Sequence, residues 1–487
     1  MRINKECQKL IVTLLFNLGG GLLSFFGAML GEEGRAVNFV LLLFIYIIAF
    51  LCMNNKDKVF FLIVSIWQYT IMMEAIYRFV RYEKTPFETY FIFDILGIIF
   101  LFIMLKKLIQ TGLRDGAVIC LLLICAVGTF STVINSGNFV DYLSALRIVI
   151  RYLGIYLYFC TNKFEVPSWG KWFIYASFIA FAVEVLLDVN VDFRNGLFGY
   201  EYTGGLFSLL LVIWSAGSLI QCINGKKRMM DFGVKFVITE ICLIMMESKA
   251  EIILYGLWVV IIFVIYRSRS QKGQVRRLMG AMVAALGLSA VWSVFVSYFS
   301  KFTSLSGSNI FDAIALRLQR SEMMQESSFT LLSDYFVEYD WQKIFGVGMG
   351  TSIPPRYFYW IINTGKDADE LFNILKFSEI FDSHRLYYKF FASGYNVLRL
   401  DIGYLGTAIF FVMLILIALR AIKICRAGKS EFTSIVGVIG VWQVISLVFR
   451  VVNNNIIVQH LPMALSFALF GIIYFESNQL KKKDSNQ

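Results

Sequence analysis

The chain has 487 residues, of which 58% are hydrophobic and only 16% are charged, and its mean hydropathy is +0.68. This composition is typical of polytopic membrane proteins and excludes a soluble globular domain, because soluble chains expose far more charge. The formal net charge of +11 does not indicate nucleic acid binding, since the basic residues are spread over alternate short loops. We therefore expect an all-α polytopic membrane protein.

Apolar runs long enough to cross a bilayer, about 17 to 23 residues each, follow one another along the chain. The first follows a basic flank and is too long for the apolar region of a signal peptide, so we predict a membrane helix there. The predicted spans cover residues 9–30, 36–53, 59–80, 87–105, 116–135, 143–160, 172–190, 206–223, 232–248, 250–267, 278–300, 401–420, 432–450 and 461–476. About fourteen helices are expected, and the two around Ser248 could instead form a re-entrant hairpin.

The short loops between these spans alternate in charge. Basic residues gather at the N-terminus and near residues 56–58, 106–114, 163–171, 226–228, 267–277, 420–429 and 481–483. An even number of crossings places all of these segments on one side, which the positive-inside rule assigns to the cytoplasm. Both termini, including a basic tail at residues 477–487, are thus expected in the cytoplasm.

The stretch from Lys301 to Leu400 is the only long interval without a membrane-length apolar run. It separates about eleven helices in residues 1–300 from about three in residues 401–476, and the alternation of sides makes it a large extracytoplasmic loop. Its first part is mixed enough to form an amphipathic helix, in which Arg317 and Arg320 share one face at i,i+3.

The second part of this loop contains the sequence FGVGMG, from Phe345 to Gly350. Its glycines, Gly346, Gly348 and Gly350, predict a turn. No strand within a βαβ unit precedes them, so a nucleotide-binding loop is not expected. We expect the turn to allow close backbone approach to the membrane or to a substrate.

Several ionisable residues fall inside the predicted spans, where insertion of a charge costs about 2.5 to 3.5 kcal/mol. They are Glu74, Asp94, Arg147, Arg151, Glu184, Glu240 and, at a helix end, Lys249. Arg147 and Arg151 lie at i,i+4 and point the same way. Two interpretations stay open: the arginines form buried ion pairs with Asp94 or Glu184, or they bind an anion such as a lipid diphosphate, whose oxygens match the guanidinium fork.

Four stretches carry a resemblance to a known family. They are NGLFGYEYTGG (195–205), IMMESKAEIILY (244–255), ALRLQRSEMM followed by WQKIFGVGMG (315–350), and SGYNVLRLDIGYLG (393–406). In this order they resemble motifs of the Wzy-type polysaccharide polymerases and the related O-antigen ligases. Lys249 stands where the family more often has Arg, and Tyr395, followed by Asn396, stands where the ligases carry a His.

The resemblance implies an enzyme of the bacterial inner or plasma membrane that polymerises undecaprenyl-diphosphate-linked oligosaccharide units outside the cytoplasm. It implies no nucleotide sugar, metal or other cofactor, and its expected partners are membrane lipids, a chain-length regulator and a flippase. The alternatives are a ligase that transfers finished glycan to another acceptor, and a lipid-linked oligosaccharide flippase or other transporter. The absence of a detectable internal repeat counts against transporters built from two related halves.

Glycosyl transfer from a lipid diphosphate requires cations that stabilise the departing diphosphate and a base for the acceptor proton. The candidates for diphosphate binding are Arg147, Arg151, Lys249, Arg317, Arg320 and Arg385. His384 is the candidate base because of its pKa range, with Asp382, Asp401 and the loop glutamates as alternatives. The catalytic candidates are therefore His384, Arg317 and Arg320.

Overall fold

The computed structural model describes residues 102, 105, 115–135, 139–166, 170–186, 204–246, 249–266, 339–350, 394–427, 430–453 and 460–485. Every regular element within these residues is a helix. The predicted spans at 9–30, 36–53, 59–80 and 278–300 lie outside them, as does nearly all of 87–105. The all-α class is thus confirmed for the described part of the chain.

The described helices follow the predicted spans closely. They are α6 (Gly116–Ile134), α7 (Phe139–Thr161), α8 (Gly170–Leu186), α9 (Gly204–Ile223), α10 (Met229–Met245), α11 (Lys249–Tyr266), α14 (Asp340–Phe345), α18 (Gly394–Ala427), α19 (Glu431–Asn453) and α20 (His460–Ser485). Among the described residues, three segments, Gly116–Ile134, Gly394–Ala427 and Glu431–Val452, are long and apolar enough to cross a membrane. Membrane-helix character is therefore supported, whereas the described residues do not support as many as fourteen spans.

Three predicted boundaries are wrong, and one of them is the C-terminal end of α18, which lies at Ala427 and not at residue 420. Helix α18 begins at Gly394, so the last residues assigned to the large loop are helical. Helix α20 continues to Ser485 instead of ending at residue 476, so most of the predicted tail at 477–487 belongs to a helix. Leu480 is buried in this extension, which explains why the helix outlasts the apolar run.

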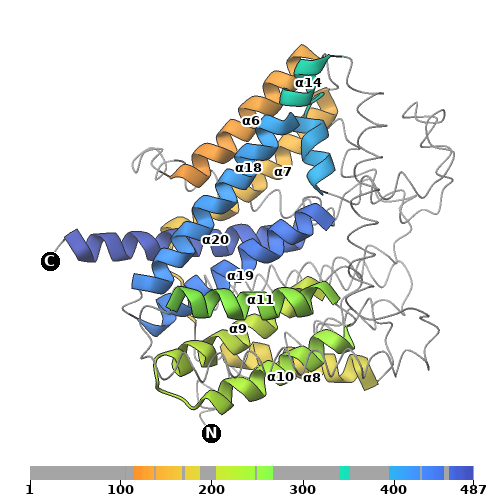
Figure 1. Cartoon of the computed structure of the whole chain (residues 1–487). Helices are drawn as coiled ribbons and strands as arrows, with labels where there is room; N and C mark the ends of the chain where they lie inside the picture. The colour runs from red at the N-terminus through yellow and green to blue at the C-terminus, as the bar shows by residue number, and fades with distance from the viewer. Residues whose placement is uncertain are drawn as a thin grey trace, which may run out of the picture.

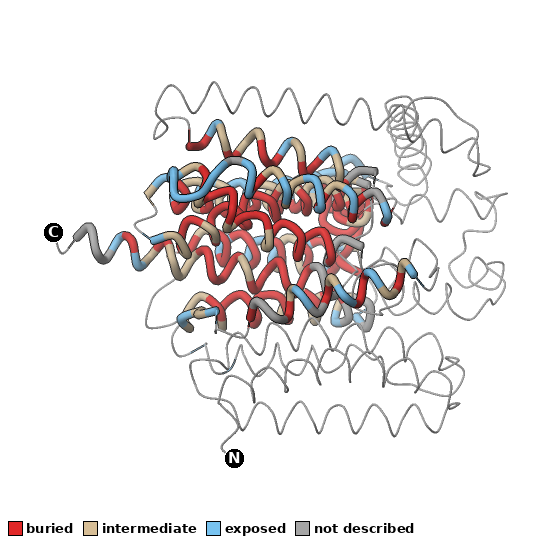
Figure 2. The backbone as a smooth tube through the Cα atoms, turned by 90° about the horizontal axis from the view of Figure 1, so that it is seen from below, coloured by how far each residue is buried: buried red, intermediate tan, exposed pale blue. Residues whose placement is uncertain are grey.

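Helices α18 and α19 form the centre of the described bundle. Helix α18 packs along α19 on one side and along α6 on the other, and α20 lies against α7. Helices α9 and α11 pack against α19, and α10 packs against α9 and α11; Figure 1 shows these three helices in green. Figure 2 shows the buried positions running through the middle of this bundle. Its aromatic centre joins Trp258 of α11 to Trp442 of α19, with ring centroids 6.1 Å apart.

Helices α7 and α20 approach so closely that Gly471 has no room for a side chain. A Cβ atom at Gly471 would lie 2.5 Å from the carbonyl oxygen of Tyr156, and the Tyr152 ring stacks on Phe467 one turn away. We expect Gly471→Ala to lower the free energy of unfolding by about 1 to 3 kcal/mol, the usual result of overpacking. Chemical unfolding of the purified protein in detergent micelles measures this effect, and an unchanged midpoint would contradict it.

One end of the bundle brings several basic segments together. Glu431, at the start of α19, accepts hydrogen bonds from Gln221 at the end of α9 and from Lys226 in the following turn. Thr433 donates a hydrogen bond of 2.9 Å to Glu476 of α20. The described basic segments at residues 226–228, 420–427 and 481–483 therefore belong to the same end. This arrangement agrees with the predicted gathering of basic loops on one side, while the assignment of that side to the cytoplasm stays a prediction.

Candidate functional site

The glycine sequence after α14 forms the predicted turn. Gly346, Gly348 and Gly350 have φ values of 87°, 133° and 85°, a region that side chains disfavour and glycine adopts readily. Gly346 also ends α14: its N–H makes the last helical hydrogen bond, to the carbonyl oxygen of Gln342 at 2.7 Å, and its positive φ then turns the chain away. Each residue from Gly346 to Gly350 is buried. The turn is thus an internal element and not an exposed loop.

The turn docks on a break in α18. The Val347 N–H donates to the Leu400 carbonyl oxygen at 2.9 Å, and the Gly350 N–H donates to Oδ2 of Asp401 at 3.1 Å. Gly403, with φ 64° and ψ −171°, interrupts the helical backbone immediately after these acceptors. The chain thus forms two helical stretches that meet where the turn is bound.

At Gly346 the close backbone approach is to α18, and an approach of the turn to membrane or substrate stays a prediction. A Cβ atom at Gly346 would lie 2.4 Å from the backbone oxygen of Asp401. One at Gly403 would lie 2.2 Å from the backbone oxygen of Ile344. Two glycines from distant segments therefore allow the two backbones to touch.

Helix α6 holds the other side of the turn with polar side chains. Ser131 Oγ donates to the Gly346 carbonyl oxygen at 2.6 Å, and the Met349 N–H donates to Oγ1 of Thr132 at 2.9 Å. Gln342 Nε2 donates to Oδ1 of Asn135 at the end of α6. We call this assembly, formed by residues 342–350, 400–403 and the end of α6, the glycine joint. Figure 1 shows α14 at the common end of α6 and α18.

Tyr395 and Asn396 lie in the first stretch of α18, within one or two turns of the glycine joint. Asn396 is completely buried, whereas Tyr395 is half-buried and its ring lies 5.2 Å from the guanidinium carbon of Arg399. Asp401, left as an unranked alternative base, is buried and accepts the Gly350 N–H. The structure thus places Tyr395 and Asn396 near the FGVGMG turn along the chain of α18.

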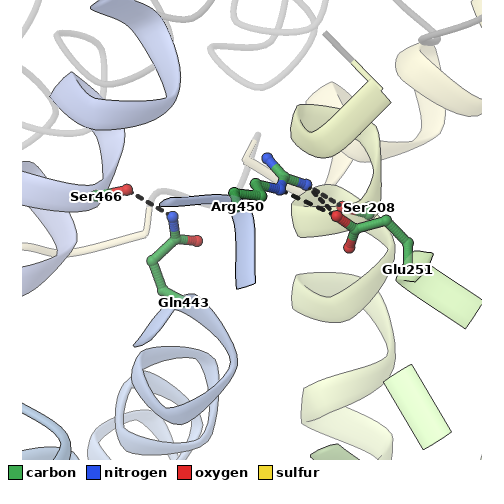
Figure 3. A network of polar contacts seen from close by, with 5 residues as sticks. All are labelled: Ser208, Glu251, Gln443, Arg450 and Ser466. Atoms are coloured by element: carbon green, nitrogen blue, oxygen red, sulfur yellow. Dashed lines mark hydrogen bonds and ion pairs between the residues drawn. The ribbon is translucent and has the colours of Figure 1, made fainter. Parts of the chain in front are cut away.

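A buried ion pair joins α11 to α19. Glu251 is 5% exposed and Arg450 is 9% exposed, and the Arg450 Nε donates to Oε1 of Glu251 at 3.0 Å. Nη2 donates to the same oxygen and lies 3.4 Å from the Ser208 hydroxyl of α9. Figure 3 shows this pair beside the hydrogen bond of 2.6 Å from Gln443 to Ser466, which links α19 to α20.

A second ion pair, between a buried carboxylate and a half-buried arginine, joins α6 to α18. Arg420 Nη1 lies 2.6 Å from Oδ1 of Asp115, and the Tyr156 hydroxyl donates to Oδ2. Asp115 also accepts the Ala117 N–H at 3.0 Å, so it caps the N-terminus of α6. Arg420 is therefore a residue of the helix interior and not of the basic loop to which its segment was assigned.

The two ion pairs lie at opposite ends of the bundle. Arg450 follows Glu431 by nineteen residues of α19, which correspond to about 28 Å along the helix axis. Because α18 and α19 are antiparallel neighbours joined by a short turn, the glycine joint and Arg450 both lie at the ends far from that turn. Arg420 lies near the turn itself. The glycine joint and the Glu251–Arg450 pair thus share one end of the bundle.

The sequence-predicted cations are only partly described. Arg151 of α7 is completely buried and Arg147 is half-buried on the same helix. Glu184 of α8 is also buried, and the pairing of these arginines with Glu184 or with Asp94 stays a prediction. Lys249 begins α11, two residues before Glu251. Arg317, Arg320, His384 and Arg385 lie outside the described residues, as does Asp94.

Four ionisable residues of the two ion pairs were missed by sequence reasoning. Arg420 and Arg450 are the last residues of predicted spans, Glu251 is the second residue of another, and Asp115 immediately precedes one. A search that included the ends of spans as well as their interiors would have found all four. No protein-family model matches the sequence, and no curated protein matches it either.

Proposed function

We propose that this protein polymerises undecaprenyl-diphosphate-linked oligosaccharide repeat units into surface polysaccharide. The reaction is a glycosyl transfer on the outer face of a bacterial cytoplasmic membrane, with the termini in the cytoplasm. A chain-length regulator and a flippase are the expected partners. Generic membrane-helix character is compatible with this proposal, and the glycine joint is the observation that favours it.

The glycine joint supports the proposal because it unites two of the resembling motifs. FGVGMG belongs to one motif, and Leu400, Asp401 and Gly403 belong to the segment SGYNVLRLDIGYLG. Hydrogen bonds and facing glycines bring these two segments into contact. If the likeness were a chance pattern of small residues, there would be no reason for the two segments to bind each other. The glycines of both motifs allow the same backbone contact, as we expect for two motifs that belong to one family.

The proposed reaction needs charged groups at the end of the bundle that holds the glycine joint. A hydroxyl of the acceptor glycan attacks the anomeric carbon of the donor sugar, a new carbon–oxygen bond forms, and the bond to the diphosphate oxygen breaks. The diphosphate leaves with the bonding electrons, and nearby cations stabilise its charge. We assign this role to Lys249, Arg317 and Arg320, with Arg147, Arg151 and Arg385 as further candidates. The acceptor proton passes to a base, for which His384 is the candidate.

A complementation experiment tests this function. The gene is deleted in its host, and surface glycan is separated on a gel after restoration of wild type, Arg317→Ala, Arg320→Ala, Lys249→Ala or His384→Ala at matched membrane abundance. We expect single repeat units in the deletion strain, a ladder with wild type, and at least a hundredfold less long glycan with either loop arginine variant, because each would remove electrostatic stabilisation worth about 2.7 to 4 kcal/mol.

Lys343→Ala is the matched control for this experiment. Lys343 is an exposed residue of the glycine joint, and its side chain pairs with exposed Asp340 at 2.8 Å, within α14 and not between α14 and α18, so its loss should leave the ladder unchanged. Accumulation of lipid-linked single units on the cytoplasmic face of the deletion strain would indicate translocation and contradict the polymerase assignment. Long glycan that forms but is not attached to its final acceptor would indicate a ligase.

A further inference from the structure

The Glu251 carboxylate has one oxygen that is bonded twice and one that no described residue reaches. Both Nε and Nη2 of Arg450 donate to Oε1, as Figure 3 shows. A guanidinium fork that faced the carboxylate squarely would occupy both oxygens. Oε2 is instead buried and accepts no hydrogen bond from the part of the chain that the structure describes. A buried acceptor without a donor destabilises the folded state, because its lost hydration is not replaced. A ligand that donates a hydrogen bond to Oε2 would remove this destabilisation.

The other buried carboxylate–arginine pair differs in this respect. Asp115 uses both of its oxygens, since Oδ1 contacts Arg420 and the Ala117 N–H, while Oδ2 accepts the Tyr156 hydroxyl. Both carboxylates are buried, and both are paired with an arginine from a different helix. The open oxygen is therefore a particular feature of Glu251 and not a general feature of ion pairs in this bundle.

The charge balance around Glu251 defines the ligand. The pair with Arg450 is neutral, so a cation on Oε2 would add an unbalanced buried charge, and an anion would be repelled. A neutral O–H donor completes the carboxylate without changing the charge. The hydroxyl of Ser208, which lies 3.4 Å from Nη2 of Arg450, is a second uncharged polar group next to the ion pair. A hydroxyl group of a sugar is a neutral donor of this kind.

The location of Glu251 connects this ligand with the substrate. Glu251 lies two residues after Lys249 on α11, at the end of the bundle that holds the glycine joint. We propose that Oε2 of Glu251 binds a sugar hydroxyl of the lipid-linked glycan, with Arg450 as a positioning residue that fixes the carboxylate. This inference rests on the proposed polymerase function and adds a sugar-binding residue to it.

Binding of lipid-linked single repeat units, extracted from the deletion strain, tests the inference. The full-length protein is purified in detergent, and its Kd for these units is measured by native mass spectrometry. The main variant replaces both partners, Glu251→Met with Arg450→Met, because exchange of a buried ion pair for apolar residues of similar volume often preserves folding. We expect a Kd about 10-fold to 100-fold weaker than that of wild type, from loss of a hydrogen bond to a charged group.

Asp115→Asn is the matched control, because it removes the charge of a similarly buried carboxylate at the opposite end of the bundle. Its Kd should equal that of wild type. An unchanged Kd in the double methionine variant, while wild type binds and extends the lipid-linked units, would overturn the role of Glu251 and leave the proposed function intact. Failure of wild type to bind these units would contradict both.

A conservative variant keeps the inference testable if the double variant does not fold. Glu251→Asp retains the charge that Arg450 requires but withdraws the oxygens by one methylene group. We expect a folded protein whose Kd is about tenfold weaker, because a displaced acceptor weakens the hydrogen bond. An unchanged Kd for Glu251→Asp would overturn the inference.

Discussion

Replacement of Gly403 by alanine is expected to open the glycine joint and to lower the free energy of unfolding by about 3 kcal/mol or more. Two effects add at this position. The backbone angles, φ 64° and ψ −171°, belong to a region that is essentially restricted to glycine. The new Cβ would also lie 2.2 Å from the backbone oxygen of Ile344, which cannot rotate away as a side chain could. Gly346→Ala should act similarly, because it faces the backbone of Asp401 at 2.4 Å.

Chemical unfolding in detergent micelles measures the loss for Gly403→Ala, and the glycan ladder in the complementation strain reports its consequence for function. Gly256→Ala is the matched control, since Gly256 lies within α11 and a Cβ there would meet nothing within 4 Å. Alanine is the better helix former, so this control should be neutral or stabilised by up to about 1 kcal/mol. An equal free energy of unfolding for Gly403→Ala and Gly256→Ala would show that the facing glycines do not hold the joint together.

Replacement of Arg420 by methionine is expected to lower the free energy of unfolding by about 3 to 5 kcal/mol, because it leaves the Asp115 carboxylate buried without its cation. Asp115 is only 6% exposed and cannot move into water without losing its cap on α6. Adding Asp115→Asn should recover most of the loss, since asparagine is neutral and is an equally good N-cap. The same unfolding measurement applies to the single and double variants.

Arg426→Met provides the control for the Arg420 experiment. Arg426 lies two turns further along α18 and is exposed, so its replacement should change the free energy of unfolding by less than about 0.5 kcal/mol. If Asp115→Asn failed to rescue Arg420→Met, the loss would come from the other contacts of the guanidinium. Its carbon lies 4.9 Å from the Tyr474 ring centroid, and Nη1 lies 3.4 Å from the Tyr156 hydroxyl.

Hydropathy predicted the described helices well, because a helix in an apolar environment needs a continuous apolar run and little else. The bounds of α6, α9, α11 and α19 differ from the predicted spans by only a few residues. The method failed where tertiary contacts extend a helix beyond its apolar run. Helix α18 begins in the polar sequence GYNVLRLD, which the glycine turn binds, and α20 continues past residue 476 because Leu480 is buried.

The candidate site was less predictable, because its polar contacts join residues that are far apart in the chain. Glu251 and Arg450 are separated by 199 residues, and neither one alone indicates its partner. The positive φ angles of the FGVGMG glycines could be expected from a turn of small residues, but nothing local indicated that the turn would bind to α18. The roles of Arg317, Arg320, His384 and Arg385 stay predictions, since these residues lie outside the described part of the chain.

The contacts of the glycine joint also set an order of events during biogenesis. Ser131 at the end of α6 is synthesised 215 residues before Gly346, whose carbonyl oxygen it binds. At about 5 to 20 residues per second, the ribosome needs on the order of 10 to 40 s to produce that partner. Until then the polar side chains at the end of α6 are without their hydrogen-bond partners from the glycine turn. Nascent chains truncated before residue 346 will therefore present Ser131 and Thr132 to chaperones, proteases or neighbouring helices.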